Sequence, residues 1–389
     1  MTGHVMDFFF WERLEMHTMS TASEIAPNVW LGPTPDPSLV DPSPGPKPMA
    51  PELMAPKPAD YDVMIEATDL AQMPDHKTFK ILDSLLKHPE NAIPHIEFPG
   101  SGSIMPPTWS QAEVDALMDT CAWIYRTANG VSPADRYKRK DSKVDQLDSD
   151  GDSIMLSPSD NQAPAGKKIL IHCTDGYTES SLLAIAYYMY ANCKPVHEAW
   201  LELHCEKKRN FFAYPTDVAL LTAIQPRILQ ASPAYVGDIA SLVPDPPGWL
   251  SRMDGSLPSR VLDYMYLGNL GHANNTELLR ELGIGQVLSV GEQLTWSEEE
   301  KEKWEKDTVM FVNNVQDNGV DPLTEEFERC FVRARRLNVI IQPHLRFSYE
   351  LLKWEEYQAK KRGKPLKREL EWGTIAREIA AMNKPYSRQ

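Results

Sequence analysis

The chain has few cysteines, fewer basic than acidic residues, and no long hydrophobic run. Its five cysteines form no Cys-x-x-Cys pair, which argues against a structural zinc site and favours a reducing cytoplasmic or nuclear compartment. The formal net charge of −15 excludes a general nucleic-acid binder, because a phosphate backbone requires a basic surface. No apolar stretch approaches the roughly 18 residues that span a bilayer, so we expect no membrane association.

The composition is that of a globular protein with more than one domain. The 389 residues include 42% hydrophobic and 24% charged side chains, enough for two domains of ordinary size. Proline or polar composition predicts a proline-rich loop at 33–58, a disordered insertion at 138–167 and a linker at 231–258. We therefore expect a first domain at 1–230 and a second at 259–389.

An internal repeat runs through the two halves. The segment "APNVWLGP" (26–33) parallels "DYMYLGNL" (263–270), and a strand-like run follows each, "YDVMIEAT" (61–68) and "IGQVLSVG" (284–291). Strands that alternate with helices predict an α/β fold. We expect two repeated domains, each with a central, largely parallel sheet flanked by helices.

The stretch "LIHCTDGYTESSLLAIAYY" (170–188) carries the most specific chemical signal. A short apolar strand leads into a loop with glycine, and the loop leads into an apolar helix. Backbone N–H groups and the helix dipole converge in such a loop and bind anions. The same field is expected to favour the thiolate of Cys173, with Gly176 allowing the tight turn and Ser180 placed to donate to the thiolate.

This arrangement resembles the dual-specificity phosphatases of the protein tyrosine phosphatase superfamily, whose signature is His-Cys, five residues, Arg and Ser or Thr. The match covers His172, Cys173, Gly176 and Ser180. With the repeat, the chain most resembles fungal tandem dual-specificity phosphatases, here with the variant loop "HCTDGYTE" in the first copy. The resemblance implies a phosphate loop made of His172, Thr174, Asp175, Gly176, Tyr177, Thr178, Glu179 and Ser180 around the nucleophile Cys173.

Glu179 departs from the signature, because it stands where the family has arginine. That arginine grips two phosphate oxygens and stabilises the transition state. Opposite charges about 5 Å apart contribute roughly 3 kcal/mol at an effective dielectric constant of about 20, so the replacement costs about four powers of ten in rate. A carboxylate in the first turn also suits a helix dipole, and Thr178 or Glu179 is a candidate helix cap. We further hypothesise that the Glu179 carboxylate fills the anion site from within.

The general acid is also missing from the first copy. The family carries an aspartate after a strand in a loop that precedes the cysteine. The matching stretch, "PHIEFPGSGSIMPP" (94–107), has no aspartate, and its only acid, Glu97, lies inside the strand-like run. The basic cluster at 207–209 is interpreted as a solvated helix end.

In the second copy, "MFVNNVQDNGVDPLTEEFERC" (310–330) matches the acid loop. Asp317 takes the general-acid position, with Asp321 as the second candidate. A cysteine loop should follow, but none does. Cys330 is no substitute, because it lies in a helix-like run with no glycine loop after it.

Spacing indicates how much of the second copy is missing. Asn210 and Asn338 are each followed five residues later by proline and an apolar-periodic helix, which pairs them in the repeat. Cys173 lies 37 residues before Asn210, whereas Asp317 lies only 21 before Asn338. At typical element lengths about 45–50 residues are absent after Cys330, including the central strand. An alternatively spliced exon or an error in the predicted gene explains the gap.

Two functions follow from the resemblance and the departures from it. The first is a dual-specificity phosphatase that dephosphorylates Tyr, Ser and Thr through a phospho-cysteine intermediate, with Cys173 and Asp317 as the catalytic-type residues. The second is a pseudophosphatase that binds or scaffolds phosphoprotein partners without turnover. Neither requires a cofactor or a metal ion, and phosphorylated proteins are the expected substrates or partners in both.

Overall fold

The structure is a computed structural model of the whole chain. It describes residues 21–35, 60–88, 93–103, 110–131, 166–237, 245–262, 265–304, 308–312, 339–342, 360 and 363. Several predictions fall outside these residues. They concern most of the loop at 33–58, almost all of the insertion at 138–167, and Asp317, Asp321 and Cys330. The predicted domain boundaries accordingly stay predictions. No helix in the described part combines the length and the apolar character needed to cross a membrane.

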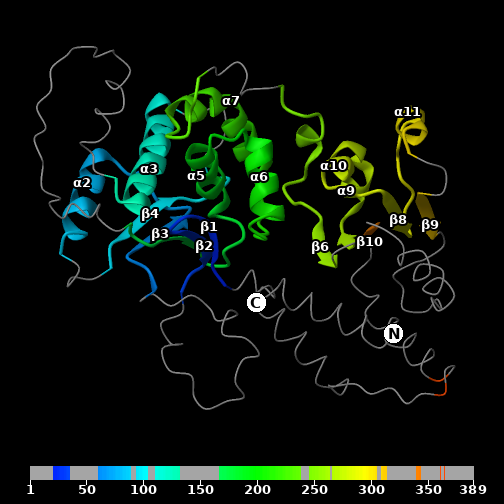
Figure 1. The fold of residues 1–389 in the computed structure, drawn as a ribbon, viewed down its shortest axis with the longest axis horizontal. Helices are drawn as coiled ribbons and strands as arrows, with labels where there is room; N and C mark the ends of the chain where they lie inside the picture. Colours follow the sequence, from blue (N-terminus) through cyan, green and yellow to red (C-terminus); the bar gives the residue numbers. More distant parts are fainter. Residues whose placement is uncertain are drawn as a thin grey trace, which may run out of the picture.

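Two five-stranded sheets form the framework, and Figure 1 shows them beside each other. The first has the order β1-β2-β5-β3-β4 and the second the order β6-β7-β10-β8-β9. In each sheet the first two strands are antiparallel and the other neighbours are parallel. The strands of the first sheet are Ser23–Ala26 (β1), Val29–Pro33 (β2), Val63–Thr68 (β3), His95–Pro99 (β4) and Ile169–Cys173 (β5). Those of the second are Ser259–Leu262 (β6), Met265–Leu267 (β7), Gln286–Val290 (β8), Val309–Val312 (β9) and Val339–Gln342 (β10).

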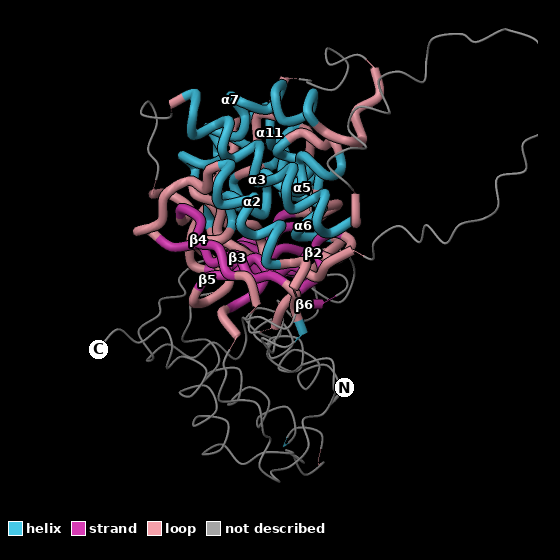
Figure 2. Tube along the Cα trace, turned by 90° about the vertical axis from the view of Figure 1, so that its left-hand side faces the viewer, coloured by secondary structure: helices cyan, strands magenta, loops and turns pink. Residues whose placement is uncertain are grey.

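Helices gather mainly on one side of the strands, as Figure 2 shows. In the first unit, the described residues within 21–237, they are His76–Leu85 (α2), Gln111–Asn129 (α3), Ser181–Asn192 (α5), Val196–Cys205 (α6) and Pro215–Ala231 (α7). In the second unit, the described residues within 259–342, they are Leu270–Asn274 (α9), Thr276–Glu281 (α10) and Glu298–Glu302 (α11). The chain therefore has the predicted mixed α/β fold, with mostly parallel sheets flanked by helices.

Local sequence explains the elements of the first unit. α3 begins with a capping box between Ser110 and Glu113 and ends at Gly130, whose φ of 64° closes the helix in the left-handed conformation. β5 is buried along its whole length, as expected for a central parallel strand. α5 contacts α3, α6 and α7, which explains why its sequence is apolar on nearly every face.

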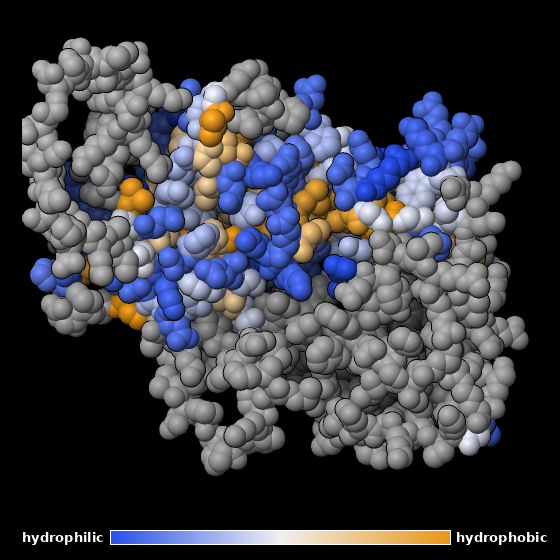
Figure 3. All heavy atoms as spheres, in the orientation of Figure 1, coloured by the Kyte–Doolittle hydropathy of each residue, from blue (hydrophilic) through white to orange (hydrophobic). Residues whose placement is uncertain are grey.

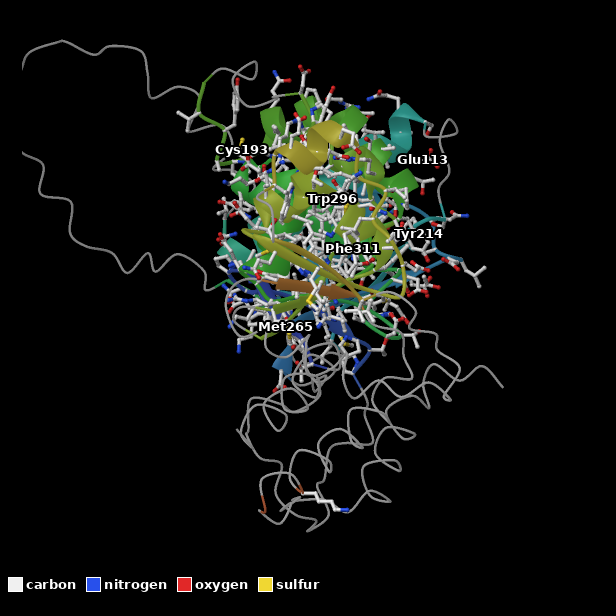
Figure 4. The ribbon with its side chains drawn as sticks, turned by 90° about the vertical axis from the view of Figure 1, so that its right-hand side faces the viewer. Glu113, Cys193, Tyr214, Met265, Trp296 and Phe311 are labelled. Carbon is white, nitrogen blue, oxygen red and sulfur yellow. The ribbon has the colours of Figure 1, made fainter. Side chains whose placement is uncertain are left out.

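Trp296 is a core residue of the second unit, where it is 6% exposed and donates from Nε1 to the Ala273 carbonyl at 2.9 Å. Its ring lies 4.9 Å from that of Trp304. Figure 4 shows Trp296 on the helix side of the second sheet and Met265 on the opposite side of the strands. The two tryptophans thus help to anchor the short helices to this sheet.

A strand fills the central position of the second sheet, which differs from the expectation that this strand is missing. β10 pairs with β7 on one side and β8 on the other, as β5 pairs with β2 and β3. Proline spacing had paired Asn338 with Asn210, at the entrance to a helix. The β-branched run "VII" (339–341) instead favours a strand, and β10 has a partner on each side.

Part of the predicted linker packs against the first unit. Trp249 is fully buried, the Ala213 amide donates to the Gly255 carbonyl at 2.7 Å, and His204 Nε2 lies 3.0 Å from the Pro258 carbonyl oxygen. In Figure 3 hydrophilic residues cover most of the described surface in view, while hydrophobic residues are visible between the two units. The prolines of this segment predicted an unstructured linker, but its Trp249, Leu250 and Leu257 side chains are buried.

Candidate active site

The candidate site is the loop that joins β5 to α5. Cys173 ends the central strand, and the loop continues to Ser180, the N-cap residue of α5. Gly176 has φ 66°, and a Cβ atom at this position would lie 2.4 Å from the backbone nitrogen of Pro33. Only glycine fits such a turn, so the predicted loop geometry is present.

The surroundings of Cys173 disfavour its thiolate. The side chain is 1% exposed, and Sγ lies 3.3 Å from Ser180 Oγ and 3.4 Å from Asp175 Oδ1. Burial raises the pKa of the Cys173 thiol, the hydrogen bond with Ser180 opposes this, and the charges of Asp175 and Glu179 raise the pKa further. The expectation of a lowered thiol pKa is therefore wrong, because burial and two carboxylates outweigh the loop and helix dipoles.

Asp175 occupies the amides of the loop. Its Oδ1 accepts a hydrogen bond from the Tyr177 amide at 2.8 Å and a second from the Thr178 amide at 3.3 Å. A short acidic side chain readily accepts from amides two and three residues further on. Two of the loop nitrogens that were expected to face an external anion thus face a carboxylate of the loop itself.

Glu179 does not fill the anion site, contrary to the hypothesis from the sequence. Its Oε2 accepts from Thr178 Oγ1 at 2.7 Å, and it accepts from no backbone amide of the described loop. It does not cap α5 either, since Ser180 is the N-cap residue. The first-turn amide of Leu182 donates instead to Ser101 Oγ at 2.7 Å, so the cap comes from another segment of the chain.

Ser101 belongs to the loop after β4, where the resemblance predicts a general acid. Its amide and its Oγ both donate to the Glu179 carbonyl, at 2.8 and 3.0 Å. The next amide, that of Gly102, donates to Asp217 Oδ2 at 2.9 Å. The described part of this loop contains no carboxylate, and Glu97 is exposed on the edge strand β4. The loop is therefore fastened to the helix without supplying an acid.

Arg209 supplies a positive charge beneath the loop. It is fully buried and donates to the carbonyl oxygens of Thr21 and Gly176. Burial lowers its pKa to about 10, and electrostatic interactions with Cys173 and Asp175 act in the opposite direction. The interpretation of residues 207–209 as a solvated helix end is wrong for Arg209, whose guanidinium satisfies carbonyl groups that would otherwise lie unpaired.

His172 and Thr34 hold the start of the loop. Thr34 donates from its amide to the Cys173 carbonyl at 2.8 Å, and its Oγ1 lies 3.0 Å from His172 Nδ1. Burial lowers the pKa of His172 to about 4, with a further contribution from His95. At neutral pH His172 is thus uncharged and offers no positive charge to the loop.

The structure brings the predicted loop residues together and leaves the rest untested. His172 and Cys173 end β5, and the residues that connect them to α5 are Thr174, Asp175, Gly176, Tyr177, Thr178, Glu179 and Ser180. Donor atoms of Cys173, Asp175 and Glu179 lie within 4.8 Å of one another, the spacing of a candidate metal group. Asp175 already accepts from two amides, however, and amide donors at a helix start disfavour a cation.

Sequence reasoning missed three supporting residues, Ser101, Arg209 and Asp217. Ser101 lies in the stretch where only an acid was expected, and Arg209 directly precedes the asparagine that defines the repeat. Asp217 is 1% exposed, and burial raises its pKa to about 6, partly offset by the Gly102 amide. Its position in the first turn of a helix does not predict a partner elsewhere in the sequence. The Gly102 amide, more than a hundred residues earlier, is nevertheless its hydrogen-bond donor.

Comparisons with known proteins point to phosphatases. No protein-family model matches the chain. Among curated proteins the chain is similar to a dual specificity protein phosphatase. This relative is PPS1 of Saccharomyces cerevisiae, 25% identical over an alignment of 457 residues that covers 84% of this chain and 51% of the relative. The chain therefore spans about half the length of the curated relative that it matches.

Among solved structures, Tk-PTP in its active form aligns over 53% of this chain and 97% of that chain, with 18% identity and a TM-score of 0.28. The sequence similarity to PPS1 supports the protein tyrosine phosphatase superfamily as the group to which the chain is related.

Proposed function

We propose that this chain is a tandem dual-specificity phosphatase relative whose first loop does not hydrolyse phosphoesters, and that it acts as a pseudophosphatase. The common strand order of the two sheets supports a tandem origin. The similarity to a dual specificity phosphatase supports the family. The negative charge of the loop supports the absence of turnover.

Hydrolysis through a phospho-cysteine needs a thiolate, a cation that holds the phosphoryl oxygens, and an acid for the leaving group. The observation that carries the proposal is the position of Cys173 Sγ, 3.4 Å from Asp175 Oδ1, with the thiol pKa raised. Glu179 stands where the phosphoryl-binding cation is needed. The buried Arg209 does not replace it, because its guanidinium donates to the backbone carbonyls of Thr21 and Gly176 and is not exposed to solvent.

Phosphorylated proteins are the proposed partners. They follow from the family relationship, because dual-specificity phosphatases act on such proteins. A phosphate group is repelled by the carboxylates of Asp175 and Glu179, so the partner contacts surfaces outside the loop. The proposed compartment is the cytoplasm or the nucleus.

An active phosphatase is the second candidate, and one contact favours it. Ser180 Oγ lies 3.3 Å from Cys173 Sγ, where a hydroxyl can stabilise a departing thiolate. An active phosphatase loses its activity when the Cys173 sulfur is removed, whereas a pseudophosphatase does not change. Removal of this sulfur therefore distinguishes the two candidate functions.

Hydrolysis of p-nitrophenyl phosphate and of phosphotyrosine peptides by the full chain tests the proposal. Three proteins are compared: the wild type, Cys173→Ser, and Cys205→Ser as a control at an exposed thiol. We expect all three to show the same residual rate. A drop of about tenfold or more in Cys173→Ser, with Cys205→Ser unchanged, would establish the active phosphatase instead.

A further inference from the structure

We propose that Asp175 is a built-in ligand of the anion-binding loop and is the residue that excludes phosphate from it. This inference rests on the proposed function, because it explains why a phosphatase-like loop stays without substrate. The loop keeps the glycine turn and the helix start of an anion site. The difference is that two of its amides, those of Tyr177 and Thr178, already have a negatively charged partner.

One oxygen atom of Asp175 makes the decisive contacts. Oδ1 lies 2.8 Å from the Tyr177 nitrogen, 3.3 Å from the Thr178 nitrogen and 3.4 Å from Cys173 Sγ. An oxyanion held by these amides next to the thiol needs an oxygen in the same place. Its entry therefore requires the Asp175 side chain to leave and the two hydrogen bonds to break.

The charge of Asp175 is balanced from the inner side of the loop. Arg209 bonds to the carbonyl of Gly176, the next residue, and interacts electrostatically with both Asp175 and Cys173. Because Arg209 is buried, its charge is retained beneath the loop and acts on Asp175 without facing solvent. This arrangement stabilises a carboxylate within the loop.

Asp175 and Glu179 thus block an anion in different ways. Asp175 occupies the amides of Tyr177 and Thr178, whereas the Glu179 carboxylate accepts from Thr178 Oγ1 and adds negative charge at the position of the family's arginine. Removal of the Glu179 charge alone leaves the amides occupied. Removal of the Asp175 side chain frees them, and the two changes together should open the loop most fully.

Tungstate binding, measured by titration calorimetry on the full chain, tests these different contributions of Asp175 and Glu179. The variants are Asp175→Ala, Glu179→Gln and the double variant. Asp69→Asn is the control, because Asp69 acts electrostatically on Tyr214, as Asp175 and Glu179 do, and contacts no amide of the Tyr177–Thr178 pair. We expect no binding by the wild type, Glu179→Gln or Asp69→Asn, binding by Asp175→Ala, and about tenfold tighter binding by the double variant.

Asp175→Asn separates occupancy from charge. It removes the same charge as Asp175→Ala but keeps an oxygen that accepts from the Tyr177 amide. We expect tungstate to bind Asp175→Ala at least about tenfold more tightly than Asp175→Asn. Equal affinity of these two variants, or binding by Glu179→Gln as tight as by the double variant, would overturn the proposal.

A measurement on the wild type keeps the test independent of how the variants fold. Tungstate should leave the amide NMR signals of Tyr177 and Thr178 unshifted, and shifts of both signals would overturn the proposal. Turnover is measured on the same samples. Hydrolysis that depends on Cys173 without tungstate binding would refute the proposed function alone, whereas tungstate binding to the wild type without hydrolysis would refute only the role of Asp175.

Discussion

The two sheet units share one strand order but differ in the residues that come after the central strand. In register, Val339–Gln342 of β10 correspond to Ile169–His172 of β5, because both strands pair at matching positions with the strands on either side. The next residue in sequence is Cys173 in the first unit and Pro343 in the second. The strand order therefore depends on the apolar, β-branched core of the strand, and the chemistry depends on the residues directly after it.

A second difference lies in buried charge. Among the described residues, one arginine and one carboxylic acid are buried. They are Arg209 and Asp217, and both belong to the first unit. Both hold backbone groups of the loops around Cys173. Buried charge is costly unless it is paired or hydrogen-bonded, so its restriction to these loops indicates that their geometry depends on it.

The largest expected effect comes from proline in either central strand. Proline removes a hydrogen-bond donor and is not tolerated in the middle of a sheet, so Leu170→Pro and Ile340→Pro should each cost about 3 kcal/mol or more in the unit that carries the substitution. Hydrogen exchange measured by mass spectrometry should rise in β2 and β3 for Leu170→Pro. It should rise in β7 and β8 for Ile340→Pro.

Val309→Pro is the matched control for this experiment, because Val309 is the first residue of the edge strand β9. Proline at the start of an edge strand should change exchange much less. If Ile340→Pro leaves β7 and β8 as protected as in the wild type, β10 does not hold the second sheet together.

The next effect concerns the buried carboxylate of the first unit. Burial raises the pKa of Asp217 from 3.8 to about 6. A raised pKa means that the folded state binds the proton more tightly, so this contribution to stability is complete below about pH 4 and is lost as the pH rises through 6. A shift of about two pKa units corresponds to about 3 kcal/mol.

Asp217→Asn, which keeps an acceptor for the Gly102 amide, should therefore be up to about 3 kcal/mol more stable than the wild type at pH 8 and equally stable at pH 4. Urea unfolding at both pH values measures this.

Glu300 in the second unit is the control of opposite sign, because the Ser297 amide lowers its pKa. Glu300→Gln should lose stability at neutral pH and lose none in acid. If the stability difference between Asp217→Asn and the wild type is the same at pH 4 and pH 8, burial does not perturb the pKa of Asp217.

Much of the framework is predictable because short-range pattern determines it. The apolar run at Leu170 and Ile171 predicts a buried strand, the apolar periodicity after Ser180 predicts a helix, and the structure has both as β5 and α5. The α/β class follows from the alternation of such segments. β10 was missed because proline spacing was used to align Asn338 with Asn210, although the residues between Asn338 and the proline are better strand formers than helix-entry residues.

The site was less predictable because its decisive contacts depend on geometry. The sequence shows that Asp175 and Glu179 are both in the loop, but not which carboxylate reaches the amides. Distance and direction decide this, and the shorter side chain, two residues before the Tyr177 amide, reaches it. Ser101 and Arg209 come from segments far from Cys173 in sequence, and neither lies within a pattern that predicts contact with the loop.

The smallest expected effect compares how the two units cap their helices. In the second unit Ser297 caps α11 locally, accepting from the Glu300 amide at 3.2 Å on an exposed surface. In the first unit α5 relies on Ser101, which is 5% exposed, accepts from the Leu182 amide at 2.7 Å and from Ser181 Oγ at 3.0 Å, and donates to the Glu179 carbonyl. Because the groups that Ser101 satisfies are shielded from water, its loss leaves donors unpaired, whereas water can replace Ser297.

Ser101→Ala should therefore cost about 2 kcal/mol and Ser297→Ala about 0.5–1 kcal/mol in urea unfolding. Ser101→Ala should also speed hydrogen exchange of the Leu182 amide, because that donor loses its acceptor, while Ser297→Ala leaves this amide unchanged. Equal costs for the two variants, with the Leu182 amide still protected, would mean that the loop after β4 does not support the start of α5. In that case the contacts of Arg209 and Thr34 would support the loop around Cys173, and those of Ser101 would not.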